Sequence, residues 1–192
     1  MKKFISLALA LTLVLGLFAG CTSGNTAQPT EAPTEATEVP LVLEGTLEEL
    51  LNQVIEQQPV EFSGGVIPVD LTDTSEEGLW ALKAYTGLDS AEQITEAAAY
   101  EPMMGSIAFS MVMVRVKDAG TKTVAESMKS GIDTRKWICV EADQLLVCGF
   151  SDVVMLIMVD SNTGMTAQSF VDAFQKVCAA QHEGAQLEFV LE

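Results

Sequence analysis

The stretches IAFSMVMVRVK (residues 107–117) and VVMLIMV (residues 153–159) decide which fold this chain can form. In the first, apolar side chains fill both sets of alternating positions, and the first charges are Arg115 and Lys117. The second is apolar throughout. Strands that are apolar on both faces lie inside a sheet covered on both sides, either by helices alone or by helices and a partner. We therefore expect two central strands here.

Helical patterns surround these strands. Three predicted capping boxes, in which an N-cap side chain and a Glu three residues later bond each other's backbone, mark helix starts at Thr46, Asp89 and Thr123. Ser75 and Gly87 are suited to begin and end another helix. The expected helices cover residues 46–58, 75–87, 91–99, 123–132 and 166–181.

Shorter alternating runs predict further strands at residues 66–71, 136–141, 145–150 and 186–191. The order of these elements indicates an α+β fold: a mostly antiparallel sheet with helices packed against it, preceded by a helical N-terminal half. Residues 41–192 have the length of a single domain with its own hydrophobic core.

The first 20 residues have the pattern of a lipoprotein signal peptide. Lys2 and Lys3 precede an apolar run that ends in the small residues Ala19 and Gly20, and Cys21 follows. The run is too short for a comfortable membrane span of about 20 residues. We expect the Cys21 thiol to carry a diacylglyceryl group that anchors the protein to the extracytoplasmic face of the cell membrane. The alternative is an ordinary secretory signal, cut after Ala19 or Gly20.

Residues 21–40 are expected to be the lipidated cysteine and a disordered linker. Thr, Pro, Ala and Glu dominate this segment, and no large apolar residue precedes Val39. Such a composition cannot bury enough apolar surface to offset the entropy cost of ordering. A flexible chain of this length spans about 25 Å on average, enough to lift a domain clear of lipid headgroups.

The charge balance excludes one class of partner. Without the two lysines of the signal peptide, eight Lys and Arg remain against 27 Asp and Glu, a net charge of −19. Nucleic-acid binding needs clustered basic residues, so we expect no nucleic-acid partner. Anionic lipid would repel the domain, so attachment to the bilayer depends on Cys21. The remaining expected partners are an envelope protein or a small ligand.

Two longer stretches carry a family resemblance. These are EPMMGSIAFSMVMVRVKDAG (residues 101–120) and DTRKWICVEADQLLVCGFSDVVMLIMVDS (residues 133–161). With the lipidation motif, the sequence over residues 45–160 resembles a domain-of-unknown-function family of small lipoproteins from Gram-positive anaerobes. The resemblance implies a lipidated cysteine, a Thr/Pro/Glu-rich linker and an α+β domain, and it carries over no catalytic residue.

Catalytic and metal-binding patterns are missing from the sequence. The one histidine, His182, lies at the end of a predicted helix, where it suits the helix dipole. The segment 160–164 starts like a calcium loop, but it lacks the turn glycine and the bidentate acid that such loops need. We expect no cofactor, no metal site and no enzymatic activity. The rival hypothesis is copper handling or redox chemistry by the methionines, Cys139 and Cys148.

Arg135, Lys136 and Trp137 form the one basic and aromatic patch of this acidic domain. They are a candidate ligand patch that could bind an anion or a carboxylated wall polymer. The alternative is the start of a strand with a half-buried tryptophan.

The cysteines suggest a disulfide. If residues 138–150 form a hairpin with Asp143 and Gln144 as a two-residue turn, Cys139 lies opposite Cys148 in a closely spaced pair. We therefore predict neighbouring sulfurs at these two positions, with Cys178 buried on the last helix. Asp-Gln is an unfavourable turn sequence, and a longer loop would shift the register.

Overall fold

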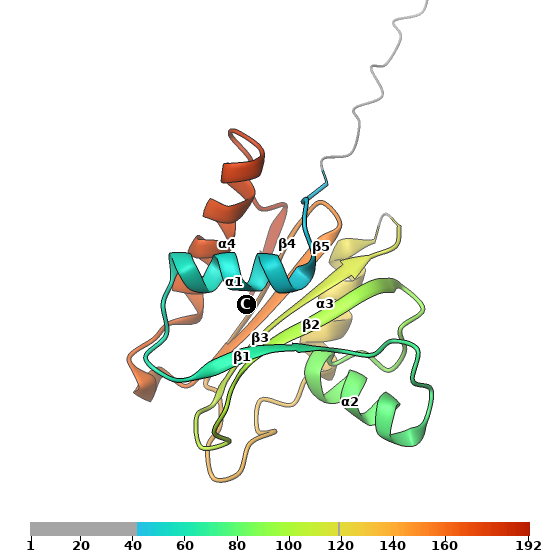
Figure 1. Ribbon diagram of the computed structural model, residues 1–192, viewed down its shortest axis with the longest axis vertical. Coiled ribbons are helices and arrows are strands. Elements are labelled where there is room, and N and C mark those ends of the chain that lie inside the picture. The colour runs from blue at the N-terminus through green and yellow to red at the C-terminus, as the bar shows by residue number, and fades with distance from the viewer. Residues whose placement is uncertain (1–41, 119) are drawn as a thin grey trace, which may run out of the picture. The chain divides into compact units, whose positions relative to one another are not determined.

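One six-stranded antiparallel sheet organises the described part of the chain (Figure 1). The computed structural model describes residues 42–118 and 120–192, so the predicted signal peptide, Cys21 and the linker lie outside the described residues. The strand order is β1-β2-β3-β5-β4-β6. The strands are β1 (Gly64–Pro68), β2 (Ile94–Pro102), β3 (Phe109–Val116), β4 (Gln144–Phe150), β5 (Val153–Val159) and β6 (Phe189–Leu191).

Helices cover both faces of this sheet. They are α1 (Leu47–Gln57), α2 (Glu76–Thr86), α3 (Thr121–Gly131) and α4 (Ala167–Gln181), with a short 3₁₀ turn η1 (Ser161–Thr163). Helices α1 and α4 pack on one face in one hydrophobic cluster, and α2 and α3 pack on the other face in a second cluster. None of the helices described is long and apolar enough to cross a membrane.

The two central strands are confirmed. β3 and β5 pair with each other, and every residue of β5 is buried. Alternate residues of β3 enter the two clusters, with Met111 and Met113 on the α1/α4 face and Val112 and Val114 on the α2/α3 face. Helices of the same chain cover these strands on both sides, so the sheet needs no partner to complete either layer.

Two of the predicted helix signals are also confirmed. Thr46 and Glu49 form a capping box at the start of α1, with Thr46 Oγ1 accepting from Glu49 N–H and Glu49 Oε2 accepting from Thr46 N–H. Ser75 caps α2, and Gly87 ends it in the left-handed conformation at φ 77°. Helix α3, however, begins at Thr121 after Gly120, and its first turn has no side-chain cap, so the capping box predicted at Thr123 is wrong.

The helix predicted at residues 91–99 is wrong, because β2 occupies this segment. Ala97, Ala98 and Ala99 favour helices intrinsically, but here all three are buried between the two helical layers. β2 pairs with β1 on one side and with β3 on the other. These contacts with distant residues override the local preference, and the N-terminal half is therefore mixed rather than helical.

The hairpin predicted over residues 138–150 is wrong as well. Residues 132–143 form an irregular loop, so no strand exists at 136–141. β4 instead pairs with β5 through a two-residue turn at Ser151 and Asp152. Ser151 adopts the positive φ that such a turn requires, at 56°.

A candidate binding pocket over a buried Lys–Glu pair

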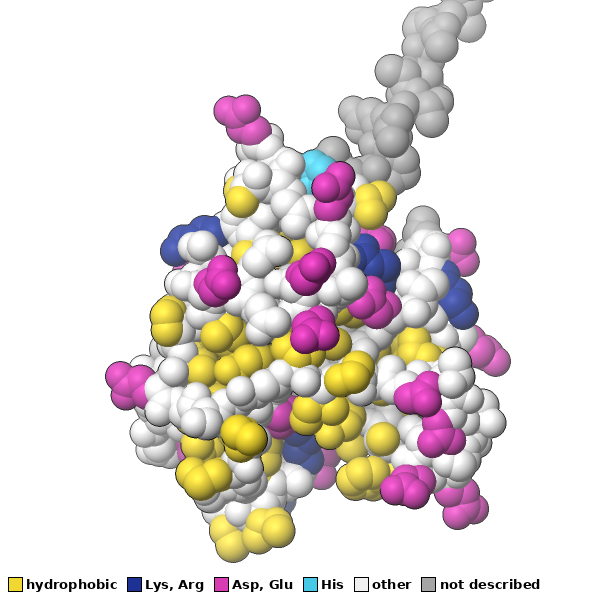
Figure 2. All heavy atoms as spheres, in the orientation of Figure 1, with side chains coloured by type: hydrophobic (Ala, Val, Ile, Leu, Met, Phe, Trp, Pro, Cys, Tyr) yellow, Lys and Arg dark blue, Asp and Glu magenta, His cyan; other side chains and the backbone are white. Residues whose placement is uncertain are grey.

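A pocket of about 280 Å³ opens on the α2/α3 side of the sheet, beside the edge strand β1. Helix α2, the ends of β1 and β2, the turn after β2 and the loop 132–143 enclose it. Its lining residues are Ile67, Trp80, Ala84, Tyr85, Glu101, Pro102, Met104, Gly105, Lys136 and Trp137. In the lower middle of Figure 2, hydrophobic side chains surround a hollow with acidic and basic side chains visible at its base.

The base of the pocket is an ion pair that is almost removed from solvent. Lys136 Nζ lies 2.7 Å from Glu101 Oε1, and the two side chains keep only 14% and 10% of their exposure. Glu101 lies on β2, next to Ser110 on β3, and Ser110 Oγ donates to the same Glu101 oxygen at 2.6 Å. In the strand register, both side chains point to the α2/α3 face. Lys136 reaches the same face from its loop.

All three ammonium protons of Lys136 have acceptors within the protein. These acceptors are Glu101 Oε1, Ser110 Oγ at 3.1 Å and the Ala84 carbonyl oxygen at 3.3 Å. Glu101 Oε2, in contrast, accepts no hydrogen bond from any described residue. Of the two charged groups in the pocket, the one with an atom free for a ligand is therefore Glu101, through its second carboxylate oxygen, and not the Lys136 ammonium.

Aromatic rings form the walls. The Lys136 ammonium lies 5.3 Å from the ring centres of both Tyr85 and Trp137, in the range of a cation–π contact. Burial and the negative charge of Glu101 raise the pKa of Tyr85, which keeps its hydroxyl protonated. Trp80 on α2 adds a third ring and remains 72% exposed.

Exposed apolar side chains continue around the rim. Met104 lines the pocket and is largely exposed, as are the nearby Met103 and, on the loop, Ile138. Methionine adapts its shape to different partners and is common on binding surfaces. Exposed apolar side chains that form a continuous patch usually mark an interaction site, whereas single exposed ones do not.

The structure separates the predicted basic patch into two parts. Lys136 and Trp137 line the pocket, whereas Arg135 is exposed and pairs with Glu141 at 3.4 Å. The loop is held by Asp133, whose Oδ1 accepts from Arg135 N–H, and by a backbone bond from Ala142 N–H to Thr134 O. The patch is thus a loop that inserts one lysine and one tryptophan against α2, not the start of a strand.

The predicted pairing of Cys139 and Cys148 is wrong. Cys148 lies on β4 between Met155 and Val190 of the neighbouring strands and is fully buried, while Cys139 is exposed on the loop. Both are free thiols, as is Cys178, which is buried on α4 as expected. Burial raises the pKa of Cys148 far above its ordinary value and that of Cys178 to about 12.

The residues proposed for copper handling are likewise dispersed. Met111 and Met113 lie in the core beneath α1 and α4, and Met103 and Met104 are exposed in the turn after β2. Among the described residues, no group of three or more His, Cys, Asp or Glu side chains could hold a metal ion.

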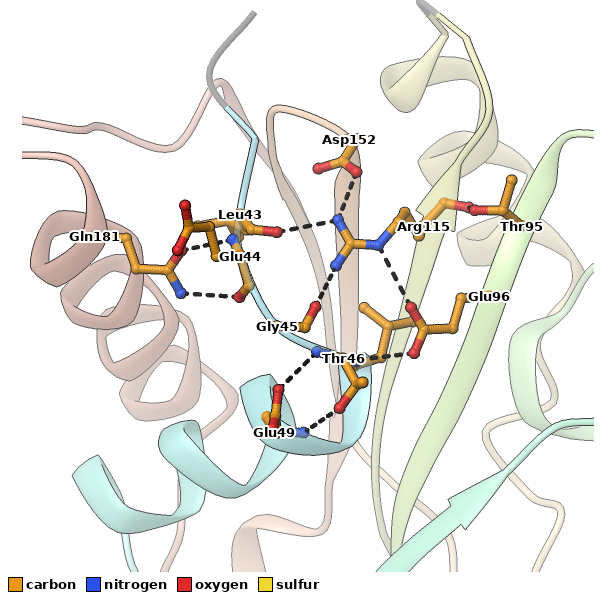
Figure 3. Close-up of polar contacts among 11 residues, drawn as sticks. Leu43, Glu44, Gly45, Thr46, Glu49, Thr95, Glu96, Arg115, Asp152 and Gln181 are labelled. Atoms are coloured by element: carbon orange, nitrogen blue, oxygen red, sulfur yellow. Dashed lines mark hydrogen bonds and ion pairs between the residues drawn. The ribbon is translucent and has the colours of Figure 1, made fainter.

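A second polar cluster joins the start of the domain to the sheet (Figure 3). Arg115 on β3 contacts Asp152 at 2.6 Å and Glu96 at 3.4 Å, and it donates to the carbonyl oxygens of Leu43 and Gly45. The Gln181 side chain bonds both backbone groups of Glu44. Nε2 of His182 makes a hydrogen bond with the Val42 carbonyl oxygen, so the one histidine fixes the incoming chain.

This cluster and the pocket lie at opposite ends of the same two strands. Glu96 and Glu101 are five residues apart on β2, which corresponds to about 17 Å along a strand. Arg115 and Ser110 are separated in the same way along β3. The chain therefore enters the domain at the end remote from the pocket.

No family model, no curated protein and no solved structure matches this chain. The resemblance to a lipoprotein family stays a prediction, and the pocket's own geometry carries the functional argument.

Lys136 and Trp137 are identifiable from the sequence, but the residues that complete the pocket are not. Glu101, Ser110 and Tyr85 each lie more than 20 residues from the loop in sequence, and only the tertiary fold brings them together. One signal was present: Ser110 is a polar residue inside an otherwise apolar strand, and a buried hydroxyl needs a partner.

Proposed function

We propose that this chain is a membrane-anchored extracytoplasmic binding protein whose pocket takes an aromatic group that carries a hydrogen-bond donor. The observation that carries the proposal is the free Glu101 Oε2 at the base of an aromatic pocket whose lysine is already saturated. Pockets with apolar walls and a few convergent polar groups are the usual form of a ligand site.

The charge arrangement favours neutral ligands with a donor over anions. An anion would meet the Glu101 carboxylate without gaining a free proton from Lys136. A ligand hydroxyl, amine or ring N–H, in contrast, would donate a hydrogen bond to Glu101 Oε2. Because this acceptor is charged, the bond would be stronger than one between two neutral groups. The aromatic body of the ligand would stack between Trp80 and Trp137.

The position of the domain start supports the anchored form of this proposal. The linker would join the domain at residues 42–46, where Arg115, Gln181 and His182 fix the chain, and the pocket lies at the other end of β2 and β3. A tether at the remote end leaves the pocket accessible while Cys21 holds the protein at the bilayer.

Tryptophan fluorescence tests the binding. The chain has two tryptophans, and both line the pocket. Titration with benzyl alcohol should give a saturable change in tryptophan emission. Benzyl methyl ether, which lacks the donor, should bind more weakly by about tenfold or more, because a hydrogen bond to a charged group contributes about 1.5–3 kcal/mol.

Helix α2 offers a matched pair of variants. Trp80→Ala should abolish the saturable response, and Leu79→Ala should preserve it, because Leu79 is exposed on the same helix but does not line the pocket. Equal affinity for the alcohol and the ether, or a response that never saturates, would contradict the proposal.

A further inference from the structure

β1 is an edge strand whose outer backbone groups point away from the sheet. Val69 N–H donates to Ala97 O, and Ser63 O accepts from Met103 N–H, so the odd-numbered residues of this segment bond β2. In an antiparallel pair, the residues between them direct their N–H and C=O groups outward. These residues are Gly64, Val66 and Pro68. Because proline has no N–H, the outward groups are the N–H of Gly64 and Val66 and the C=O of all three residues, and no described residue outside the sheet bonds them.

Gly65 on this edge lies next to two residues that line the pocket. Ile67 lines the pocket, and Gly65, two residues earlier on the same face, pairs with Glu101. A Cβ atom built on Gly65 would meet no heavy atom within 4 Å. The missing side chain therefore leaves the space between the strand edge and the Glu101 carboxylate open.

We propose that a peptide segment of a partner protein adds to β1 as a seventh strand and places a tyrosine or tryptophan side chain over Gly65 into the pocket. The outward N–H and C=O groups of β1 would supply the main-chain hydrogen bonds, and the pocket would supply specificity, as in other β-strand additions. The phenol O–H or indole N–H of the anchor would donate to Glu101 Oε2. This inference rests on the proposed function and names its ligand class.

Charge decides what kind of peptide fits. Asp70 and Asp73 follow β1, and Glu76 and Glu77 form the first turn of α2, all exposed beside the edge. A neutral or basic segment meets this surface favourably. A second copy of this chain, with its own net charge of −19 after the signal peptide, would be repelled.

Peptide binding to the full chain in detergent micelles tests the inference. The probe has seven residues: a central tyrosine, flanking threonines and valines, and a lysine at each end. One analogue carries phenylalanine in place of tyrosine, and a second carries N-methyl groups on the amides that would face β1. Calorimetry should show binding of the probe, with each analogue weaker by about tenfold, or about 1.4 kcal/mol.

Hydrogen exchange locates the contact. Saturating probe should slow exchange of the outward amides of Gly64 and Val66 by about tenfold and leave the opposite edge strand, residues 189–191, unchanged. Gly65→Val should weaken probe binding by a similar factor and Gly65→Ala less so, because the larger side chain fills the opening. The melting temperature of Gly65→Val should not fall, since valine favours strands.

Three results would overturn the inference. The first is an N-methylated analogue that binds as well as the probe, and the second is exchange of the Gly64 and Val66 amides that the probe leaves unchanged. The third is slowed exchange of these amides that depends on protein concentration alone, which would assign the edge to a second copy. Benzyl alcohol binding in the same samples would show that the pocket functions even where strand addition fails.

Discussion

Lys136 and Glu101 are the residues on which the pocket depends, and their burial makes them sensitive to substitution. Removing one partner of a buried pair leaves an uncompensated charge, at a cost of about 3–5 kcal/mol, whereas an exposed pair contributes about 0–1 kcal/mol. Urea unfolding should therefore show a large loss of unfolding free energy for Lys136→Met. The exposed pair of Lys83 and Asp89 is the control, and Lys83→Met should cost less than 1 kcal/mol.

The double variant Lys136→Met with Glu101→Gln sharpens this prediction. Without either charge, much of the loss should be recovered, because no unpaired ion remains in the pocket. A double variant as unstable as the sum of its single variants would show that the two residues do not interact as the geometry requires.

Cys148 and Cys178 predict a loss of stability at alkaline pH. Their pKa values are raised in the folded protein by burial, so both thiols stay neutral where unfolded thiols ionise. A thiol whose pKa is raised on folding contributes its full stabilisation of the folded protein at a pH below the unfolded pKa of 9. This contribution is lost as the pH rises above 9, because the unfolded thiol then ionises and the folded one does not. The unfolding free energy should fall by up to about 1.4 kcal/mol per pH unit for each thiol above pH 9.

Variants and a labelling reaction check this account of the thiols. Cys148→Ala and Cys178→Ala should each flatten the pH slope between about 9 and 10, below the range in which tyrosines ionise. In the folded protein, iodoacetamide should modify Cys139 rapidly and the two buried thiols only on unfolding. Equal reaction of all three thiols would contradict the buried positions.

At the scale of elements, α2 and α3 meet through two glycines. A Cβ on Gly131 would lie 2.0 Å from the Gly87 carbonyl oxygen, and one on Gly87 would lie 2.4 Å from the Met128 carbonyl oxygen. Gly131→Ala should cost about 1–3 kcal/mol, because the helices must separate. Since α2 carries Trp80 and Tyr85, the same variant should also weaken benzyl alcohol binding.

Gly105 provides the control, measured by thermal melting and by the fluorescence titration. It lies in the turn after β2, where an added Cβ meets no atom within 4 Å, so Gly105→Ala should change stability by less than about 0.5 kcal/mol. If Gly131→Ala behaves like Gly105→Ala, the close approach of the two helices is wrong.

The elements also show what the sequence could predict. β3 and β5 were predictable because their apolar residues fill both faces, and α1 because its capping box and apolar stripe are local signals. β2 was not, since three consecutive alanines and a Glu three residues after Asp89 favour a helix until pairing with β1 and β3 is considered. The loop around Lys136 was mistaken for a strand because its contacts with Glu101 and Ala84 come from distant parts of the chain.

For the molecule as a whole, we expect a binding domain tethered to the membrane by its lipidated N-terminus. Labelled fatty acid fed to the host should enter the protein, and Cys21→Ala should abolish both the labelling and membrane retention. Cys139→Ala is the matched control, because this exposed thiol should make no difference to either measurement. Release of the unsubstituted protein into the medium without lipid would contradict the predicted anchor.

A crystal structure of the protein with benzyl alcohol would decide whether the pocket binds an aromatic donor as proposed. We expect the ring between Trp80 and Trp137, with its hydroxyl within hydrogen-bond distance of Glu101 Oε2 and the Lys136 contacts unchanged. A ring bound elsewhere on the domain, or one in the pocket with its hydroxyl turned to solvent and away from Glu101, would contradict it.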